Sequence, residues 1–242
     1  MSTYSIYGIK FNKITEKEIM RDIENSLANK TRSVVFTPNL QIIGECIKYP
    51  HLKKILNDAD ILLPDGAGIG ILCRKKGISD FERITGIDTA FSILGIAQAN
   101  NLKVFLLGGK PDIAEKAAEK LKRTYPKLLI CGTHHGYFNK EKNSSENKCI
   151  ISKIRSAKPD ILFVCFGFPI QEQWIYENAD LLPSVSLFMG LGGSLDVWSG
   201  KCRRAPRFIQ RLNLEWLWRC LYHPQKFISL FKNVVTICFE KK

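Results

Sequence analysis

The stretch Asp60-Ile-Leu-Leu-Pro-Asp-Gly66 has the pattern of a buried strand that turns directly into a helix. Its apolar run, Ile-Leu-Leu, is typical of a strand buried on both faces. Pro64 ends the strand because it has no N–H to donate, and Gly66 permits a tight turn into a helix expected over residues 67–75. Asp65 is therefore predicted at the carboxyl edge of a sheet, where α/β proteins bind their ligands.

Asp65 has two interpretations from these residues alone. A lone carboxylate at a ligand-binding edge can act as a general base. A carboxylate in a turn can equally cap the helix that follows it, and both interpretations stay open at this point. The neighbouring Asp58-Ala-Asp60 has the D-x-D spacing of metal-dependent sugar transferases. We reject a metal role for this pair because it precedes the strand instead of following it.

Strands and helices alternate along the chain at the spacing of β–α units. This alternation predicts the fold class α/β, with a mostly parallel sheet flanked by helices. The expected strands are 33–36, 61–63, 103–107, 127–131, 160–166 and 185–189, after a strand or hairpin arm over 4–11. The expected helices are 15–29 with a capping box, 40–48, 50–57, 67–75, 85–100, 111–125 with Pro111 at its first position, one ending near 157, and one running to about 178.

The composition indicates a folded protein in a reducing compartment. The chain has 242 residues, of which 45% are hydrophobic, so it can bury a full core. Its eight cysteines are scattered without a C-x-x-C pair, so we expect free thiols. The N-terminus lacks the pattern of a signal peptide, and no apolar run reaches the roughly 18–20 residues of a spanning helix. We therefore expect a cytoplasmic protein.

The net charge of +13 is concentrated in the C-terminal part of the chain. Residues 201–242 carry ten Lys or Arg against two Glu, a net charge of +8. We therefore divide the chain into an α/β core, 1–199, and a basic helical appendage, 200–242. Arg204, Arg207 and Arg211 are expected on one side of an amphipathic helix. Tryptophans at 198, 216 and 218 favour a membrane interface with anionic lipid over simple core packing.

Glycine-rich turns are expected after four of the strands. A turn whose N–H groups face outward at the start of a helix is a ready anion site. Any one of these turns can be an ordinary connection, but four at the same edge favour nucleotide binding. Neither a G-x-G-x-x-G fingerprint nor a P-loop is present. The glycines are Gly66, Gly108, Gly109, Gly167, Gly190, Gly192 and Gly193.

Two further clusters carry groups that could bind a ligand. Cys131, His134 and His135 invite a zinc interpretation, but adjacent histidines are expected to point apart and no fourth ligand is spaced to join them. We favour hydrogen-bonding imidazoles in a loop instead. Arg83 and Asp88 lie just before a helix. Asp88 can be a cap with Arg83 as its ion-pair partner, or Arg83 can bind a phosphate or a sugar carboxylate.

Eight stretches, in order along the chain, resemble the WecG/TagA/CpsF glycosyltransferase family. Eight blocks in order are far more specific than any one of them. The stretches are TPNLQII (37–43), LLPDGAGI (62–69), ERITGID (82–88), VFLLGGKPDIAEKAA (104–118), GTHHGYF (132–138), PDILFVCFGFPIQEQW (159–174), GLGGSLDVWSGKCRRAP (190–206) and LEWLWR (214–219).

The resemblance implies a Rossmann-like α/β core with a C-terminal appendage that docks on the inner face of the cell membrane. It implies an inverting transferase, without a metal or other cofactor, that moves N-acetylmannosamine from UDP-ManNAc. The implied acceptor is the 4-hydroxyl of GlcNAc-diphospho-undecaprenol, in the linkage unit of wall teichoic acid. The alternative within the family is UDP-ManNAc uronic acid or another UDP-hexose, used for a different surface polysaccharide.

Carried onto this sequence, the resemblance assigns roles to individual residues. Asp65 becomes the expected base. Ile170 departs from the family, which often has a basic residue at this position. The resemblance therefore does not imply that residue 170 contacts the donor phosphate. Substrate binding is expected from Thr37, Asn39, Arg83 and Gln171, UDP binding from Gly108, Gly109, Tyr137, Gly167, Gly190, Gly192 and Asp196, and contact with the lipid diphosphate from Arg204, Arg207, Arg211 and Arg219.

A binding module without catalysis is the main competing class. In that case the basic tail would hold nucleic acid and the core would be a scaffold. The sequence contains no recognised nucleic-acid motif, and the basic residues of the tail lie on amphipathic stretches rich in Trp and Phe. A Rossmann-type oxidoreductase is a third class, and the missing dinucleotide fingerprint weighs against it. The sequence leaves the oligomeric state open.

Overall fold

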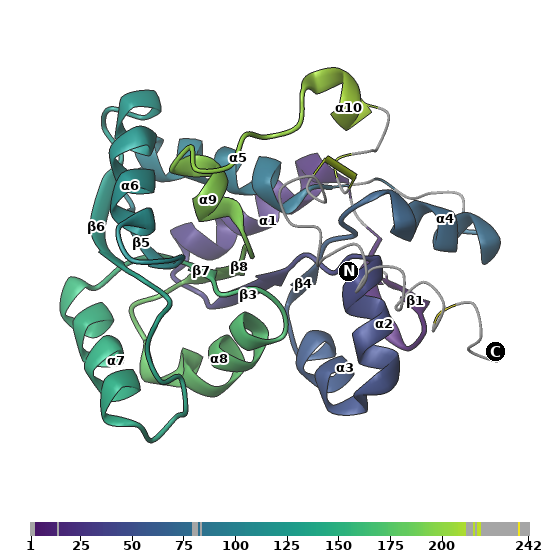
Figure 1. The fold of residues 1–242 in the computed structure, drawn as a ribbon, viewed down its shortest axis with the longest axis horizontal. Coiled ribbons are helices and arrows are strands. Elements are labelled where there is room, and N and C mark those ends of the chain that lie inside the picture. The colour runs from purple at the N-terminus through teal and green to yellow at the C-terminus, as the bar shows by residue number, and fades with distance from the viewer. Residues whose placement is uncertain are drawn as a thin grey trace.

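A six-stranded parallel sheet forms the centre of the molecule (Figure 1). The computed structural model describes residues 3–13, 15–78, 82, 84–211, 215, 217, 218 and 237. The strand order is β4-β3-β8-β7-β5-β6, and every pairing in this sheet is parallel. The predicted α/β class is therefore confirmed. The strands are β3 (Ser33–Phe36), β4 (Ile61–Leu62), β5 (Lys103–Gly108), β6 (Leu129–His134), β7 (Ile161–Cys165) and β8 (Leu187–Gly190).

Helices cover both faces of the sheet, so the molecule has three layers (Figure 1). One layer contains α1 (Glu16–Ala28), α5 (Gly86–Ala99), α6 (Ile113–Thr124) and α9 (Ser194–Trp198). The opposite layer contains α2 (Leu40–Lys48), α3 (Pro50–Asn57), α7 (Ser145–Ala157), α8 (Ile170–Asn178) and the short 3₁₀ helix η1 (Ala179–Leu181). The remaining helices are α4 (Ala67–Lys75), which extends from the end of the sheet, and α10 (Arg207–Arg211).

The centre of the sheet is buried on both faces because β5, β7 and β8 are almost entirely apolar. Val104 and Leu106 of β5 pack into one half of the core, and Phe105 and Leu107 pack into the other. This alternation follows from the period of two along a strand. All four side chains are fully buried, as expected for a parallel sheet between two helix layers.

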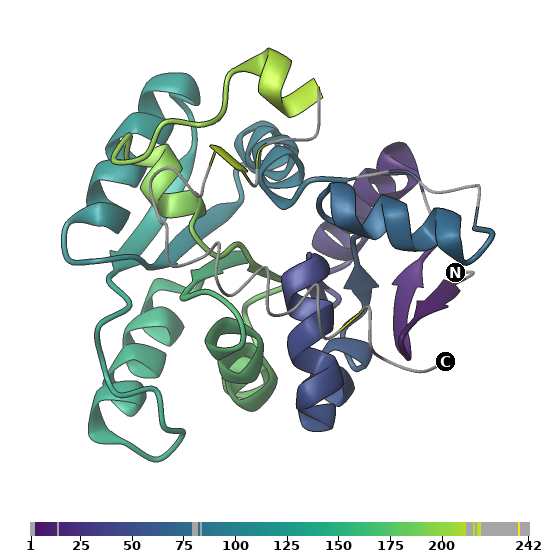
Figure 2. The same cartoon turned by 45° about the vertical axis from the view of Figure 1, so that its right-hand side comes forward.

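An antiparallel hairpin covers the edge of the sheet at β4 (Figure 2). The hairpin consists of β1 (Thr3–Ile6) and β2 (Ile9–Asn12). The buried Asn12 side chain accepts a hydrogen bond from the Leu62 backbone N–H through Oδ1, at 2.7 Å. This contact satisfies one donor of an edge strand that would otherwise be open to a further strand.

The starts of two helices test the predicted caps. Thr15 forms the expected capping box with Glu18 at the start of α1, which is thereby confirmed. Pro111, however, is not the first residue of α6, which begins at Ile113. The reason is that Asp112 has a φ of 67°, a left-handed conformation that cannot belong to a right-handed helix.

Strand β6 is longer at its carboxyl end than the sequence indicated. The loop predicted from residue 132 instead begins after His134, because Gly132, Thr133 and His134 pair with β5. Gly132 packs closely against the ring of Phe105, and a Cβ at this position would be 2.4 Å from the ring. The glycine therefore serves close packing in the sheet and not a turn.

The described part of the appendage contacts the core at several places. The Tyr7 hydroxyl donates to the Ile237 carbonyl at 3.2 Å, and the Ile237 side chain is buried with the hairpin. Within the appendage itself, the Trp218 indole N–H donates to the Arg203 carbonyl at 3.0 Å. Helix α10 begins at Arg207, so the prediction that Arg204 lies on this helix is wrong. Within the described residues, no helix is long and apolar enough to cross a membrane.

Candidate active site

The turns after β3 and β4 lie side by side at the carboxyl edge of the sheet. Leu63 N donates to Phe36 O at 2.9 Å, and Asp65 N donates to Pro38 O at 3.1 Å. These bonds extend the strand pairing by two steps beyond the last regular pair. Asp65 therefore lies beside the Thr37–Asn39 turn. This agrees with the prediction that Thr37 and Asn39 bind the substrate on which Asp65 acts. We call these two turns, with the start of α5 and Arg204, the carboxylate half of the site.

Asp65 is not the N-cap of α4. That position belongs to Gly66, whose φ of 87° is accessible mainly to glycine, and Gly66 offers no capping side chain. The capping interpretation of Asp65 is therefore wrong. Asn39, in contrast, does cap a helix, since its Oδ1 accepts from Ile42 N at the start of α2 at 3.1 Å.

The first turn of α5 completes this half of the site. Ile84 N donates to Pro64 O at 3.3 Å. Thr37 lies against Gly86 so closely that a Cβ on the glycine would be 2.9 Å from the Thr37 hydroxyl. Thr85 caps the helix through its hydroxyl oxygen, which accepts from Asp88 N at 3.3 Å. The Thr85 hydroxyl also donates to the Asp88 carboxylate, which holds this carboxylate at the first turn of α5.

Arg204 lies in this cluster and not on the outer side of the appendage. Its two terminal nitrogens donate to the Asp88 carboxylate at 2.6 and 2.7 Å, a bidentate pair. Its Nε lies 3.9 Å from Glu215 Oε1. Burial opposes the charge of the guanidinium, but the hydrogen bonds and charge of Asp88, followed by the charges of Glu215 and Asp65, raise the pKa of Arg204. Sequence analysis missed this pairing, because the two partners are 116 residues apart.

The other turns at the same edge are built on glycine. We call the turns after β5, β7 and β8 the glycine half of the site. A Cβ on Gly108 would lie 2.4 Å from the Cys165 carbonyl oxygen, so this position in the sheet admits only glycine. Gly109 N donates to Cys165 O at 3.3 Å, and Gly136 N donates to Gly109 O at 2.8 Å. The turns after β5, β6 and β7 are therefore joined to one another.

Gln171 joins the turn after β7 to the turn after β8. Its Oε1 accepts from Gly167 N at 3.1 Å and from Gly192 N at 2.8 Å, and its side chain is buried. The structure therefore places Gln171 in the glycine half. The N–H groups of Gly109, Gly167 and Gly192 were expected to face a ligand, but each of them bonds within the protein.

The glycine half nevertheless has open space above its turns. A Cβ added at Gly167, Gly192 or Gly193 would have no atom within 4 Å in the described structure. Gly190 differs, because its Cα faces the Gln171 amide, and a Cβ there would be 2.8 Å from Nε2. Glycine in these turns therefore leaves room for a ligand to approach the backbone closely, which is one of its uses in nucleotide-binding turns.

The residues expected to contact the uridine or sugar lie at the rim of this half. Tyr137 is 63% exposed. Asp196 on α9 accepts from Lys201 Nζ at 3.2 Å. The prediction that His134 and His135 point apart is wrong, because their ring centroids are 4.3 Å apart. Burial lowers the pKa of His134, whose Nδ1 lies 2.8 Å from the His135 carbonyl oxygen.

Four predicted residues are only partly covered by the structure. Arg83 and Arg219 lie outside the described residues. Arg207 and Arg211 are placed as the first and last residues of α10 by their backbone, and their side chains are not described. The predicted roles of these four arginines therefore stay predictions.

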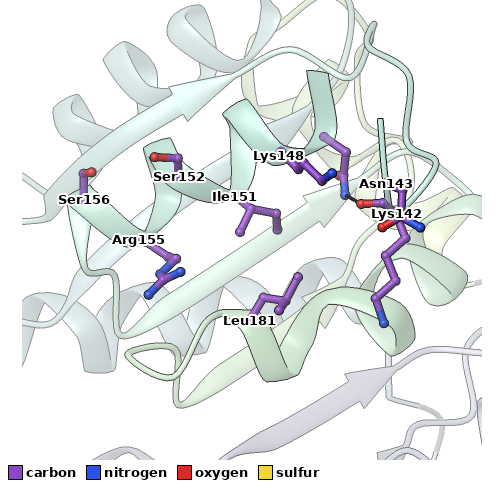
Figure 3. Close-up of a pocket in the computed structure, with 9 residues that line it drawn as sticks. Lys142, Asn143, Lys148, Ile151, Ser152, Arg155, Ser156 and Leu181 are labelled. Atoms are coloured by element: carbon purple, nitrogen blue, oxygen red, sulfur yellow. Dashed lines mark hydrogen bonds between the residues drawn. The ribbon is translucent and has the colours of Figure 1, made fainter. Parts of the chain in front are cut away.

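A cavity of about 640 Å³ lies elsewhere on the molecule, along α7 (Figure 3). Ile151 points from this helix toward Leu181 of η1, with Arg155 beside them. None of the predicted site residues that the structure describes lines this cavity. It is therefore separate from the carboxyl edge of the sheet, where the predicted residues gather.

Known proteins resemble this chain along nearly its whole length. The family model described as "Glycosyl transferase WecG/TagA/CpsF family" matches residues 4–239. A Bacillus subtilis (strain 168) protein is 31% identical over 246 residues, covering 100% of this chain and 93% of the relative. A Staphylococcus aureus (strain NCTC 8325 / PS 47) protein is 33% identical over 218 residues, covering 89% of this chain and 83% of the relative. Both relatives are named N-acetylglucosaminyldiphosphoundecaprenol N-acetyl-beta-D-mannosaminyltransferase.

Proposed function

The chain belongs to the WecG/TagA/CpsF family of glycosyltransferases, and we propose that it transfers N-acetylmannosamine from UDP-ManNAc to the 4-hydroxyl of GlcNAc-diphospho-undecaprenol. The observation that carries this proposal is that the carboxylate half and the glycine half lie at the same edge of the sheet. The carboxylate half offers a base beside a polar turn, and the glycine half offers backbone that a nucleotide can approach. The names of both relatives describe this acceptor and this sugar.

Asp65 is the base in this proposal. Inversion at a sugar carbon takes one displacement, in which the acceptor hydroxyl loses its proton as its oxygen attacks. Asp65 is held for this task by its own backbone bond to Pro38 and is not used as a helix cap. Thr37, Asn39 and Arg83 would line the acceptor side around it.

The glycine half would hold the departing UDP. Negative charge accumulates on the diphosphate as the bond to the sugar breaks, and fixed dipoles or cations at that point lower the barrier. The open faces at Gly167, Gly192 and Gly193 let the diphosphate lie directly on the backbone. Tyr137 and Asp196 at the rim are the candidates for contact with the uridine or the sugar.

The appendage would bring the protein to the lipid acceptor as a peripheral membrane protein on the cytoplasmic face. Phe208 on α10 is 64% exposed and Leu217 is 43% exposed. They lie in the segment that carries a net charge of +8. Apolar side chains among cations are typical of an interface with anionic lipid. Arg204, beside Asp65, would meet the lipid diphosphate where it enters the site.

A donor panel tests the proposed function. The purified full chain is incubated with a GlcNAc-diphospho-lipid acceptor and, one at a time, with UDP-ManNAc, UDP-ManNAc uronic acid, UDP-GlcNAc and UDP-glucose. Release of UDP and the mass of the lipid product are measured. We expect turnover with UDP-ManNAc and a lipid product that is heavier by one N-acetylhexosamine residue. Turnover with another donor alone would overturn the choice of sugar, and no acceptor-dependent release from any donor would overturn the proposal.

A further inference from the structure

Glu172 on α8 is a buried carboxyl whose position needs an explanation. Only 2% of the residue is exposed. Its Oε1 accepts from the Gln171 side-chain Nε2 at 2.9 Å. Its Oε2 is buried and has no hydrogen-bond partner among the described residues. A buried carboxyl with one unsatisfied oxygen is unfavourable for folding, so it is retained more readily where it has a task.

The partner of Glu172, Gln171, connects two turns of the glycine half. Its Oε1 receives two backbone N–H groups, from Gly167 and Gly192. Both glycines have positive φ values, 84° and 54°, and they follow the neighbouring strands β7 and β8. The amide plane also lies against Gly190. One side-chain oxygen therefore sets the spacing of the two turns.

The orientation of the Gln171 amide decides whether this connection exists. The two ends of an amide are nearly alike in shape but opposite in hydrogen bonding. If the group were rotated by 180°, its NH₂ would face the two N–H donors, and both bonds would be lost. Glu172 opposes this rotation, because its Oε1 needs a donor and would then face the amide oxygen.

We propose that Glu172 is a positioning residue for the transfer reaction: it fixes the orientation of the Gln171 amide, and Gln171 then holds the turns after β7 and β8 at the spacing that the donor diphosphate requires. This inference rests on the proposed function, because it assigns those turns to the donor. Glu172 does not touch the substrate in this arrangement and acts only through Gln171.

The charge state of Glu172 fits this role. Burial raises the pKa of Glu172 to about 7, although the hydrogen bond from Gln171 opposes the shift. A proton on Oε2 would leave Oε1 free to accept, so the connection survives in either charge state. Cys46 of α2, in the same helix layer, is a titratable group that interacts with Glu172, and burial raises the pKa of this thiol to about 12, so it stays neutral.

Three variants of α8 separate positioning from simple stability. Glu172→Leu removes the acceptor at nearly unchanged volume, and Glu172→Gln keeps an acceptor oxygen. Ile175→Ala is the matched control, because Ile175 is fully buried one turn further along α8 and carries no hydrogen-bonding side chain. The measurements are the Kd for UDP, the KM values for donor and acceptor, the thermal midpoint, and hydrogen exchange at the amides of Gly167 and Gly192.

We expect Glu172→Leu to weaken UDP binding by about tenfold and raise the donor KM, with the acceptor KM unchanged. Exchange at both glycine amides should become faster. Glu172→Gln should restore most of the affinity and the protection. Ile175→Ala should lower the thermal midpoint without these effects. Equal behaviour of Glu172→Leu and Ile175→Ala in UDP affinity and in exchange would overturn the positioning role.

The exchange measurement also separates this inference from the proposed function. If the unaltered protein bound no UDP and transferred no sugar, the proposed function would fail. Faster exchange at Gly167 and Gly192 in Glu172→Leu, but not in Ile175→Ala, would still show that Glu172 orients Gln171. Unchanged exchange would overturn the inference, whatever the enzyme assay shows.

Discussion

The carboxylate half and the glycine half lie on the same sheet edge and are built from the same strand-to-helix turns, yet they offer opposite chemistry. In the carboxylate half, side chains carry the charge: Asp65, Asp88 and Arg204 gather within one cluster. In the glycine half, the described turns expose backbone, and the space above Gly167 and Gly192 is open. One half is suited to moving a proton, and the other to receiving a diphosphate.

The two halves also differ in what holds them together. The carboxylate half depends on an ion pair between partners 116 residues apart in sequence. The glycine half depends on backbone bonds and on Gln171, four residues from one of its partners and 21 from the other. Substitutions should therefore affect the carboxylate half through charge and the glycine half through backbone conformation.

The largest expected effect separates the chemistry of the two halves. Asp65→Asn should lower the rate of transfer by about 100- to 10,000-fold, the usual range for loss of a general base. The Kd for UDP should be unchanged, because the proposed UDP site lies in the other half. Rates are followed by UDP release, and UDP binding is followed by calorimetry.

The control for this variant is Asp112→Asn, an exposed carboxylate in the turn that precedes α6. Asn tolerates the left-handed conformation of this residue, so activity should be retained. Retained turnover in Asp65→Asn would show that Asp65 is not the base. The proposed division of roles between the two halves would then be wrong.

The second effect concerns the buried carboxyl of the glycine half. The pKa of Glu172 is raised from 4.5 to about 7 in the folded protein, so the native state binds its proton more tightly than the unfolded state. The free energy of unfolding should therefore fall as pH rises from about 4.5 to about 7, by on the order of 3 kcal/mol.

Urea unfolding of Glu172→Gln at pH 5 and pH 8 checks this expectation. The variant should lose that part of the pH dependence, whereas Glu24→Gln, at an exposed position on α1, should keep it. An identical pH dependence in the unaltered protein and in Glu172→Gln would mean that the Glu172 carboxyl keeps its ordinary pKa.

The third effect tests the backbone character of the glycine half. Gly167→Ala should cost about 1–2 kcal/mol of stability, because alanine is strained at a φ of 84°. Relief of this strain would move the turn, so we expect about tenfold weaker UDP binding, measured by titration.

Gly77→Ala is the matched control for this strain. Gly77 has a φ of 72°, a Cβ there would also meet open space, and it lies after the far end of α4. The Gly77→Ala variant should lose a similar amount of stability and should bind UDP as tightly as the unaltered protein. If Gly167→Ala and Gly77→Ala lost UDP affinity equally, the loss would follow from lower stability and not from the position of the turn after β7.

The smallest effect concerns the ion pair of the carboxylate half. Arg204→Lys keeps the charge but cannot form the bidentate pair with Asp88. We expect about fivefold slower transfer to the lipid acceptor, corresponding to about 1 kcal/mol, with UDP affinity unchanged. Arg203→Lys, at the exposed neighbour, should have no effect. Weaker UDP binding in Arg204→Lys would show that Arg204 supports the UDP site, and would contradict its assignment to the carboxylate half.

Local sequence patterns predicted most helices and strands correctly. The predictions were wrong where one local pattern is compatible with two structures. The capping box of α1 was confirmed because both partners lie within four residues. Pro111 was misplaced because a proline fits the first turn of a helix as well as the turn before it, and only the left-handed Asp112 decides between them. Gly132 was assigned to the loop after the strand because its contact with the ring of Phe105, 27 residues away, cannot be recognised from the neighbouring residues.

The sequence by itself determined the α/β class, the edge on which Asp65 lies and the family, because apolar periodicity, turn residues and ordered motifs are local properties. Only the tertiary structure decided how the site is divided. It placed Arg204 against Asp88 beside Asp65, buried Gln171 between two turns, and put Glu172 beneath it. These contacts join residues from separate strand ends, and they depend on strand order, which the sequence does not encode in any single stretch.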